Sequence, residues 1–123
     1  MNKLGQYLTE IIFEFRPLKN ISIEKVNIFL DKIIKTIKVK ETHRHINLLT
    51  PGFDVLCGLK ESCLYFGWWP EHNYVRFMVS SCRKYDKNKV EKNIKTHFKT
   101  KDIIHMKINY NDLIKNRVGD LWC

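Results

Sequence analysis

Apolar and polar residues alternate along residues 4–15. Glu10 and Glu14 point to one side. The opposite face is mostly apolar and consists of Tyr7, Thr9, Ile11, Phe13 and Phe15. A period of two is typical of a β-strand that buries one face. Pro17 follows, and proline donates no hydrogen bond to a neighbouring strand. We therefore expect a first strand that ends just before this proline.

Two later stretches repeat their apolar residues every three or four positions instead. The first contains Ile23, Val26, Leu30, Ile33 and Ile37. Ser22 before it is a favourable N-cap residue, because its hydroxyl can accept a hydrogen bond from a free backbone N–H. The second follows Asp86, with Val90, Ile94, His97 and Phe98 on its buried side and lysines opposite. Both patterns predict amphipathic helices.

The remaining apolar runs are short and are separated by turn residues. They cover 53–59, 63–69, 74–81 and 103–110, and 39–49 reads as a further strand with a polar, histidine-rich middle. Thr50-Pro51-Gly52 is one of the turns. The order is strand, helix, strands, helix, strand, and most connections are short enough for hairpins. This order predicts one α+β domain over 1–123, a two-layer sandwich of an antiparallel sheet with two helices on one face.

Such an arrangement leaves the second face of the sheet uncovered. Tyr65, Trp69 and Phe77 are candidates to lie on it. A bare apolar face on a small protein usually binds a partner, most simply a second copy of the same chain. We therefore expect a homodimer.

Composition narrows the class of protein. The 123 residues are 44% hydrophobic and 28% charged, which is ordinary for a globular protein. No apolar run reaches the ~20 residues of a membrane span, and Glu10 and Glu14 interrupt the apolar start of the chain, so a cytoplasmic protein is expected.

The net charge of +9 permits nucleic-acid binding. The basic helix offers few aromatic residues for stacking, however, so nucleic acid is an unlikely partner. The four cysteines and nearby histidines lack the spacing of a zinc site, and no metal is expected.

One segment carries several unusual features together. Glu61-Ser62 separates two apolar runs, Trp69-Pro70-Glu71 stands at the next corner, and Cys82 follows the next strand. These residues resemble the small prokaryotic S-adenosylmethionine decarboxylase proenzymes, which carry an E-S-H-x-S-x-H-T-W-P-E segment and a later cysteine. Leu4-Gly5-Gln6-Tyr7-Leu8, His43-Arg44-His45 and Gly52 resemble further motifs of that family.

The resemblance implies a cofactor that the chain makes from itself. Ser62 would attack the carbonyl of Glu61, the chain would be cut between 61 and 62, and Ser62 would become a pyruvoyl group. That ketone forms a Schiff base with the substrate amine and accepts electrons as carbon dioxide leaves. Cys82 would then return a proton, and Glu71 would bind the ribose hydroxyls. The product would donate aminopropyl groups for polyamine (spermidine) synthesis.

Several positions depart from the family pattern. A helper histidine falls on Gly67, and a serine that assists processing falls on Asp54. The adenine-stacking phenylalanine falls on Leu48 by ungapped count, or near His45 if the loop is longer in this chain. His72, His43 and Asp54 are therefore candidate proton carriers. Leu48 and Trp69 are candidate substrate-binding residues.

These departures leave alternatives open. A pyruvoyl enzyme that decarboxylates arginine or ornithine is one, although Glu71 would then have no ribose to bind. The other is an uncleaved homologue that binds S-adenosylmethionine or regulates an active paralogue.

Overall fold

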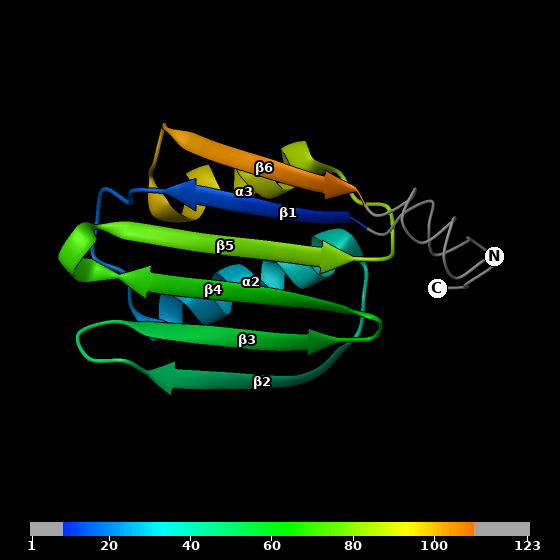
Figure 1. The fold of residues 1–123 in the computed structure, drawn as a ribbon, viewed down its shortest axis with the longest axis horizontal. Helices are drawn as coiled ribbons and strands as arrows, with labels where there is room; N and C mark the ends of the chain where they lie inside the picture. The colour runs from blue at the N-terminus through cyan, green and yellow to red at the C-terminus, as the bar shows by residue number, and fades with distance from the viewer. Residues whose placement is uncertain (1–8, 110–123) are drawn as a thin grey trace.

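Six antiparallel strands and two helices form two layers in the computed structural model, which describes residues 9–109 (Figure 1). The elements are β1 (Thr9–Phe15), α2 (Ile23–Ile37), β2 (Glu41–Leu48), β3 (Phe53–Leu59), β4 (Ser62–Trp69), the 3-10 turn η1 (Pro70–His72), β5 (Tyr74–Ser81), α3 (Lys87–Phe98) and β6 (Ile103–Asn109). The strand order is β2-β3-β4-β5-β1-β6. The predicted two-layer α+β sandwich is confirmed. The proposed motif at residues 4–8 lies outside the described residues.

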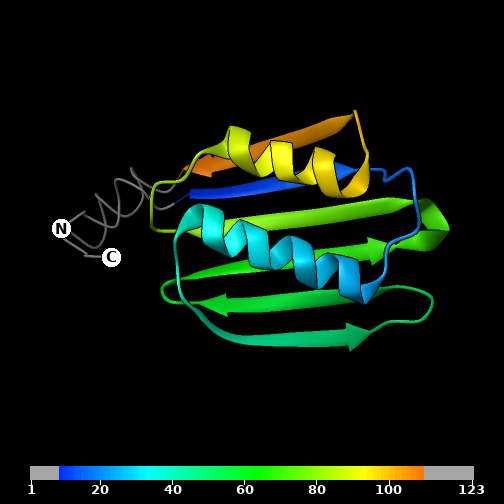
Figure 2. The same cartoon turned by 180° about the vertical axis from the view of Figure 1, so that it is seen from behind.

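The two helices make the two long connections of the sheet. Strands β2 to β5 follow one another as hairpins, whereas α2 carries the chain from β1 to the edge strand β2, and α3 carries it from β5 to β6. Figure 2 shows both helices lying across the same face. The opposite face of the described sheet carries no helix, as the sequence predicts. Neither helix is long and apolar enough to cross a membrane.

Both helices begin at the predicted caps. The Ser22 hydroxyl accepts from the Lys25 backbone N–H at 3.1 Å, and the Asp86 carboxylate accepts from the Asn88 backbone N–H at 2.9 Å. Each cap satisfies one backbone donor that the first helical turn leaves without a partner.

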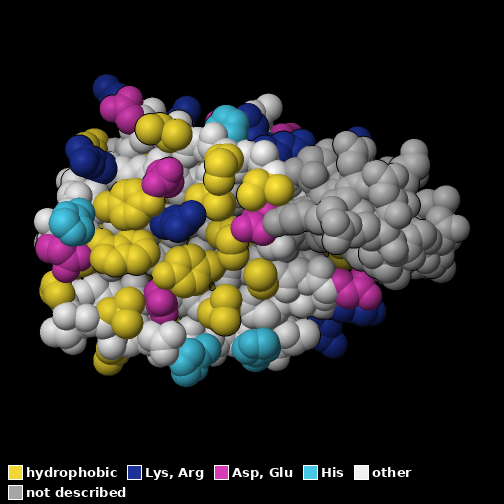
Figure 3. Space-filling view, in the orientation of Figure 1, with side chains coloured by type: hydrophobic (Ala, Val, Ile, Leu, Met, Phe, Trp, Pro, Cys, Tyr) yellow, Lys and Arg dark blue, Asp and Glu magenta, His cyan; other side chains and the backbone are white. Residues whose placement is uncertain are grey.

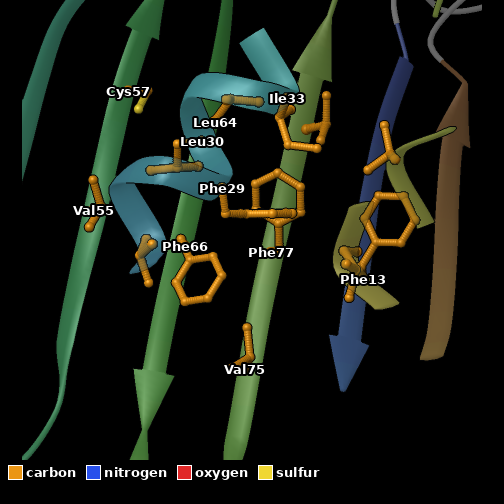
Figure 4. Close-up of a cluster of buried hydrophobic side chains, with 14 of the residues drawn as sticks. Phe13, Phe29, Leu30, Ile33, Val55, Cys57, Leu64, Phe66, Val75 and Phe77 are labelled. Atoms are coloured by element: carbon orange, nitrogen blue, oxygen red, sulfur yellow. The ribbon is translucent and has the colours of Figure 1, made fainter. Parts of the chain in front are cut away.

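Aromatic rings fill the space between the helices and the sheet. Phe29 of α2 lies 5.0 Å from the ring of Phe77 and 5.9 Å from that of Phe66, in edge-to-face arrangements (Figure 4). The prediction that Phe77 lies on the uncovered face is wrong, because Phe77 is fully buried beneath α2. It is in phase with Val75 and Val79, and these three residues point to the helices.

Arg44 fastens the edge strand β2 to α2. Its guanidinium donates to Glu41 and Asp31 at 2.7 Å, and to the Asn27 side chain at 3.0 Å. Arg44 therefore has a structural role in holding the first helix against the sheet.

Candidate functional site

The Glu61-Ser62 bond lies in the two-residue turn between β3 and β4. Leu59 pairs with Ser62 across this hairpin, so Lys60 and Glu61 form its tip. Glu61 has φ 59°, in the left-handed region that side chains with a Cβ rarely adopt. Such a residue costs about 1–2 kcal/mol, and strain of this kind gathers at functional sites. The bond expected to break thus adjoins a strained residue.

The side chain of Ser62 is held by a neighbouring strand. Its hydroxyl donates to the hydroxyl of Ser81 at 3.2 Å, and the two residues are direct cross-strand partners on β4 and β5. The Ser81 hydroxyl is fixed in turn, because it accepts from the Arg83 backbone N–H at 3.0 Å. Ser62 is half-buried, and Ser81 is fully buried.

Cys82 lies next to this pair. It is fully buried, and its sulfur is 3.7 Å from Oε2 of Glu61. Cys82 is disulfide-bonded. The structure therefore brings Glu61, Ser62 and Cys82 together, with the sulfur in its oxidised form. We call Glu61, Ser62, Ser81 and Cys82 the hairpin group.

Asp54 lies far from the hairpin group of its own chain. It pairs with Gly67, five residues along β4 from Ser62. At about 3.4 Å per residue, this separation is about 17 Å. Asp54 cannot assist its own Ser62 across that distance.

Asp54 lies on the uncovered face of the sheet, where it takes part in a chain of hydrogen bonds. Asp54 accepts from Asn47 at 2.9 Å and from the hydroxyl of Tyr65 at 3.2 Å. His45 Nε2 lies 2.8 Å from the Asn47 side-chain oxygen and extends the chain across the edge strand. Burial and the Asp54 carboxylate raise the pKa of Tyr65, so its phenol keeps its proton at neutral pH.

Aromatic side chains cover Gly67, where the family resemblance places a histidine. A Cβ on Gly67 would lie 2.6 Å from the Trp69 ring and 2.9 Å from the Tyr65 hydroxyl. The Trp69 ring itself is 5.6 Å from that of Tyr74. Only glycine fits beneath these rings without movement. We call Asp54, Tyr65, Gly67 and Trp69, together with Glu71 in the turn that follows β4, the sheet-face group.

The remaining predicted residues take different places. Glu71 is exposed in η1, two residues beyond Trp69 at the end of β4. Leu48 is 74% exposed, but it pairs with the buried Phe53 and so points to the helix side of the sheet. Leu48 does not join the sheet-face group, and its neighbour Asn47 does contact that group.

The uncovered face has a basic centre between two acidic flanks. Arg76 of β5 pairs with Gly67 on one side and with Glu14 on the other. Glu14 accepts a hydrogen bond from Tyr74, as Asp54 does from Tyr65. Figure 3 shows hydrophobic side chains gathered over this face, with acidic and basic side chains among them.

Sequence reasoning did not assign roles to Ser81 or Tyr65. The strand pattern placed Tyr65 on the uncovered face, but its bond to Asp54 depends on the register between β3 and β4. Ser81 pairs with Ser62 through the register of β4 and β5, which no local pattern reveals.

Comparisons with known proteins bear on the family and the fold. The model of the S-adenosylmethionine decarboxylase family matches residues 13–110. Among solved structures, the chain is similar to the adenosylmethionine decarboxylase of Aquifex aeolicus VF5, with a TM-score of 0.66 and 19% identity. That alignment covers 84% of this chain and 90% of the Aquifex chain, and it shows a shared fold. A search of curated proteins finds no match.

Proposed function

We propose that this chain, which belongs to the S-adenosylmethionine decarboxylase family, cuts itself between Glu61 and Ser62 and decarboxylates S-adenosylmethionine with a pyruvoyl group made from Ser62. The observation that carries the proposal is the hairpin group. A strained Glu61, an oriented Ser62 hydroxyl and the Cys82 sulfur meet at one turn. The product would serve polyamine synthesis.

The residues at the turn fit the group that the family requires. A pyruvoyl group needs a serine directly after a cleavable bond. Ser62 is such a serine, because it is the first residue after the hairpin turn, and it is half-buried. When formed, the pyruvoyl group supplies a ketone that withdraws electrons as carbon dioxide leaves the substrate.

Cys82 is the candidate proton donor for the carbon that loses carbon dioxide. It follows β5 directly and lies beside Glu61, so its sulfur is close to the new chain end. A disulfide carries no proton, so the donor is the reduced thiol. We therefore expect decarboxylation, but not chain cleavage, to require a reductant.

The sheet-face group would complete the site from a second chain. Glu71 offers an exposed carboxylate that can accept hydrogen bonds from two ribose hydroxyls. Since Asp54 and Gly67 of this group lie about 17 Å from the hairpin group of their own chain, a single chain does not join the two groups. The Ser62 side chain points to the helix side, because its partner Ser81 is in phase with the buried Val79. A twofold contact that brings the hairpin end of each chain to the sheet-face group of the other would join the two groups.

The intact mass of the purified protein tests the proposal. Wild-type protein should give fragments 1–61 and 62–123, and Ser62→Ala should stay whole. Carbon dioxide release from S-adenosylmethionine, arginine and ornithine, measured with a reductant, then identifies the substrate. A wild-type chain that stays whole after long incubation contradicts the proposal.

A second function is favoured by Gly67 and Asp54, which replace the processing residues of the family. An uncleaved chain would bind S-adenosylmethionine or regulate an active paralogue. A whole wild-type chain that binds S-adenosylmethionine and releases no carbon dioxide would support this reading. Cleavage with turnover of arginine or ornithine alone would instead support a changed substrate.

A further inference from the structure

We propose that Ser81 is a positioning residue for chain cleavage, which orients the Ser62 hydroxyl for its attack on the Glu61 carbonyl. This inference rests on the proposed function, because it concerns how the bond between Glu61 and Ser62 breaks. Nothing in the sequence resemblance gives Ser81 this role.

The sheet fixes Ser81 beside the nucleophile. Ser62 and Ser81 are cross-strand partners at the first residue of β4 and the last residue of β5. Ser81 has an exposed fraction of 0%, although serine is usually found at the surface. A buried hydroxyl needs hydrogen-bond partners, and Ser81 has three contacts within 3.2 Å.

These contacts determine the direction of each hydrogen bond. A serine hydroxyl has one proton to donate and two lone pairs to accept with. Ser81 can donate to the Arg83 carbonyl at 3.2 Å and accept from the Arg83 backbone N–H at 3.0 Å. One lone pair then remains, and it accepts from Ser62. The Ser62 proton therefore points to Ser81, which leaves the Ser62 lone pairs free for attack.

This orientation favours the first step of cleavage. A bond forms between Ser62 Oγ and the Glu61 carbonyl carbon, and the bond from that carbon to the Ser62 nitrogen breaks. The proton that leaves Oγ is balanced by one that reaches the nitrogen, which gives an ester and a free amine. In the second step the Cα proton leaves, the Cβ–Oγ bond breaks, and Glu61 departs as a carboxylate. Ser81 acts on the first step, since its contact is with the attacking hydroxyl.

Ser80 provides a matched control. It precedes Ser81 on β5 but pairs with Cys63, and strand alternation places it on the uncovered face. Ser80→Ala removes the same hydroxyl from the adjacent position without touching Ser62.

The experiment follows freshly translated full-length chains by mass over time. Ser81→Ala should slow the appearance of fragments about tenfold, as the loss of one orienting hydrogen bond can do. Ser81→Thr, which keeps the hydroxyl, should cleave near the wild-type rate, as should Ser80→Ala. Thermal unfolding of each variant, in a Ser62→Ala background, shows whether the fold is kept.

Treatment with hydroxylamine shows which step of cleavage is slow, because hydroxylamine cuts an ester but not an amide. Ser81→Ala should show little ester, since the first step is slow. Wild-type cleavage rates in Ser81→Ala, or a slow variant that accumulates ester, would overturn the inference while leaving the proposed function intact. A wild-type chain that never cleaves would overturn the proposed function, and the role of Ser81 with it.

Discussion

His97 of α3 is placed where a charge would be costly. Its ring lies 5.7 Å from that of Phe29 on α2 and 6.3 Å from that of Phe98. Its Nε2 is buried without a hydrogen-bond partner among the described residues. Burial, and then the nearby charge of Lys32, lower the pKa of His97.

Acid should therefore weaken the packing of the two helices. The unfolded chain takes up a proton on His97 near pH 6.5 while the folded chain resists it, so stability is full above about pH 6.5 and falls as the pH drops below it. His97→Phe should lose less thermal stability than wild type between pH 7 and about pH 5. His72→Gln, at an exposed histidine in η1, is the control and should follow wild type. Equal losses in His97→Phe and wild type would contradict the assignment.

At the residue scale, the helix caps could be predicted and the hairpin strain could not. Ser22 and Asp86 act within three residues of themselves, so a local pattern reveals them. The left-handed Glu61 follows from the tight pairing of β3 with β4 around a two-residue turn. Nothing in Glu61 itself indicates that conformation.

At the scale of elements, strand register determines what the site contains. The sequence predicts the strand β5 with its observed bounds, but not that Phe77 points to the helices. Alternation gives two faces without saying which is buried, and both faces of β5 carry large apolar residues. The Tyr65–Asp54 bond likewise depends on how β3 pairs with β4.

Gly67 should resist substitution because of the aromatic residues above it. Glycine ordinarily weakens a strand interior, so alanine would be expected to stabilise β4. At Gly67 the new Cβ would instead lie 2.6 Å from the Trp69 ring. We expect Gly67→Ala to lower the free energy of unfolding by about 1–3 kcal/mol, as overpacking does.

A double-mutant cycle measured by chemical denaturation checks the cause. In a Trp69→Leu background the nearest ring is absent, so Gly67→Ala should cost less than in wild type. An equal cost in both backgrounds would show that Trp69 is not the obstacle.

At the scale of the whole molecule, one end of the sheet carries the hairpin group, and its uncovered face carries the sheet-face group. The sequence predicts the uncovered face, because two helices cannot cover both sides of a six-stranded sheet. It does not predict the separation of the two groups, since Asp54 and Ser62 are only eight residues apart in the chain. The hairpin turn reverses the strand, and Asp54 ends beside Gly67.

Two inactive variants should restore each other if each site uses both groups from different chains. Ser62→Ala disables the hairpin group, and Glu71→Gln disables the sheet-face group. Co-expressed in equal amounts, half of the dimers should contain one of each chain, and one of their two sites should be intact. Activity should therefore return to about one quarter of wild type.

A pairing within one group provides the control. Ser62→Ala mixed with Cys82→Ala should recover nothing, because both changes disable the hairpin group and no intact site can form. Native mass spectrometry verifies that mixed dimers are present in each case. Mixed dimers of Ser62→Ala and Glu71→Gln contain one intact hairpin group and one intact sheet-face group on different chains. If such dimers have no activity, the two groups do not share a site.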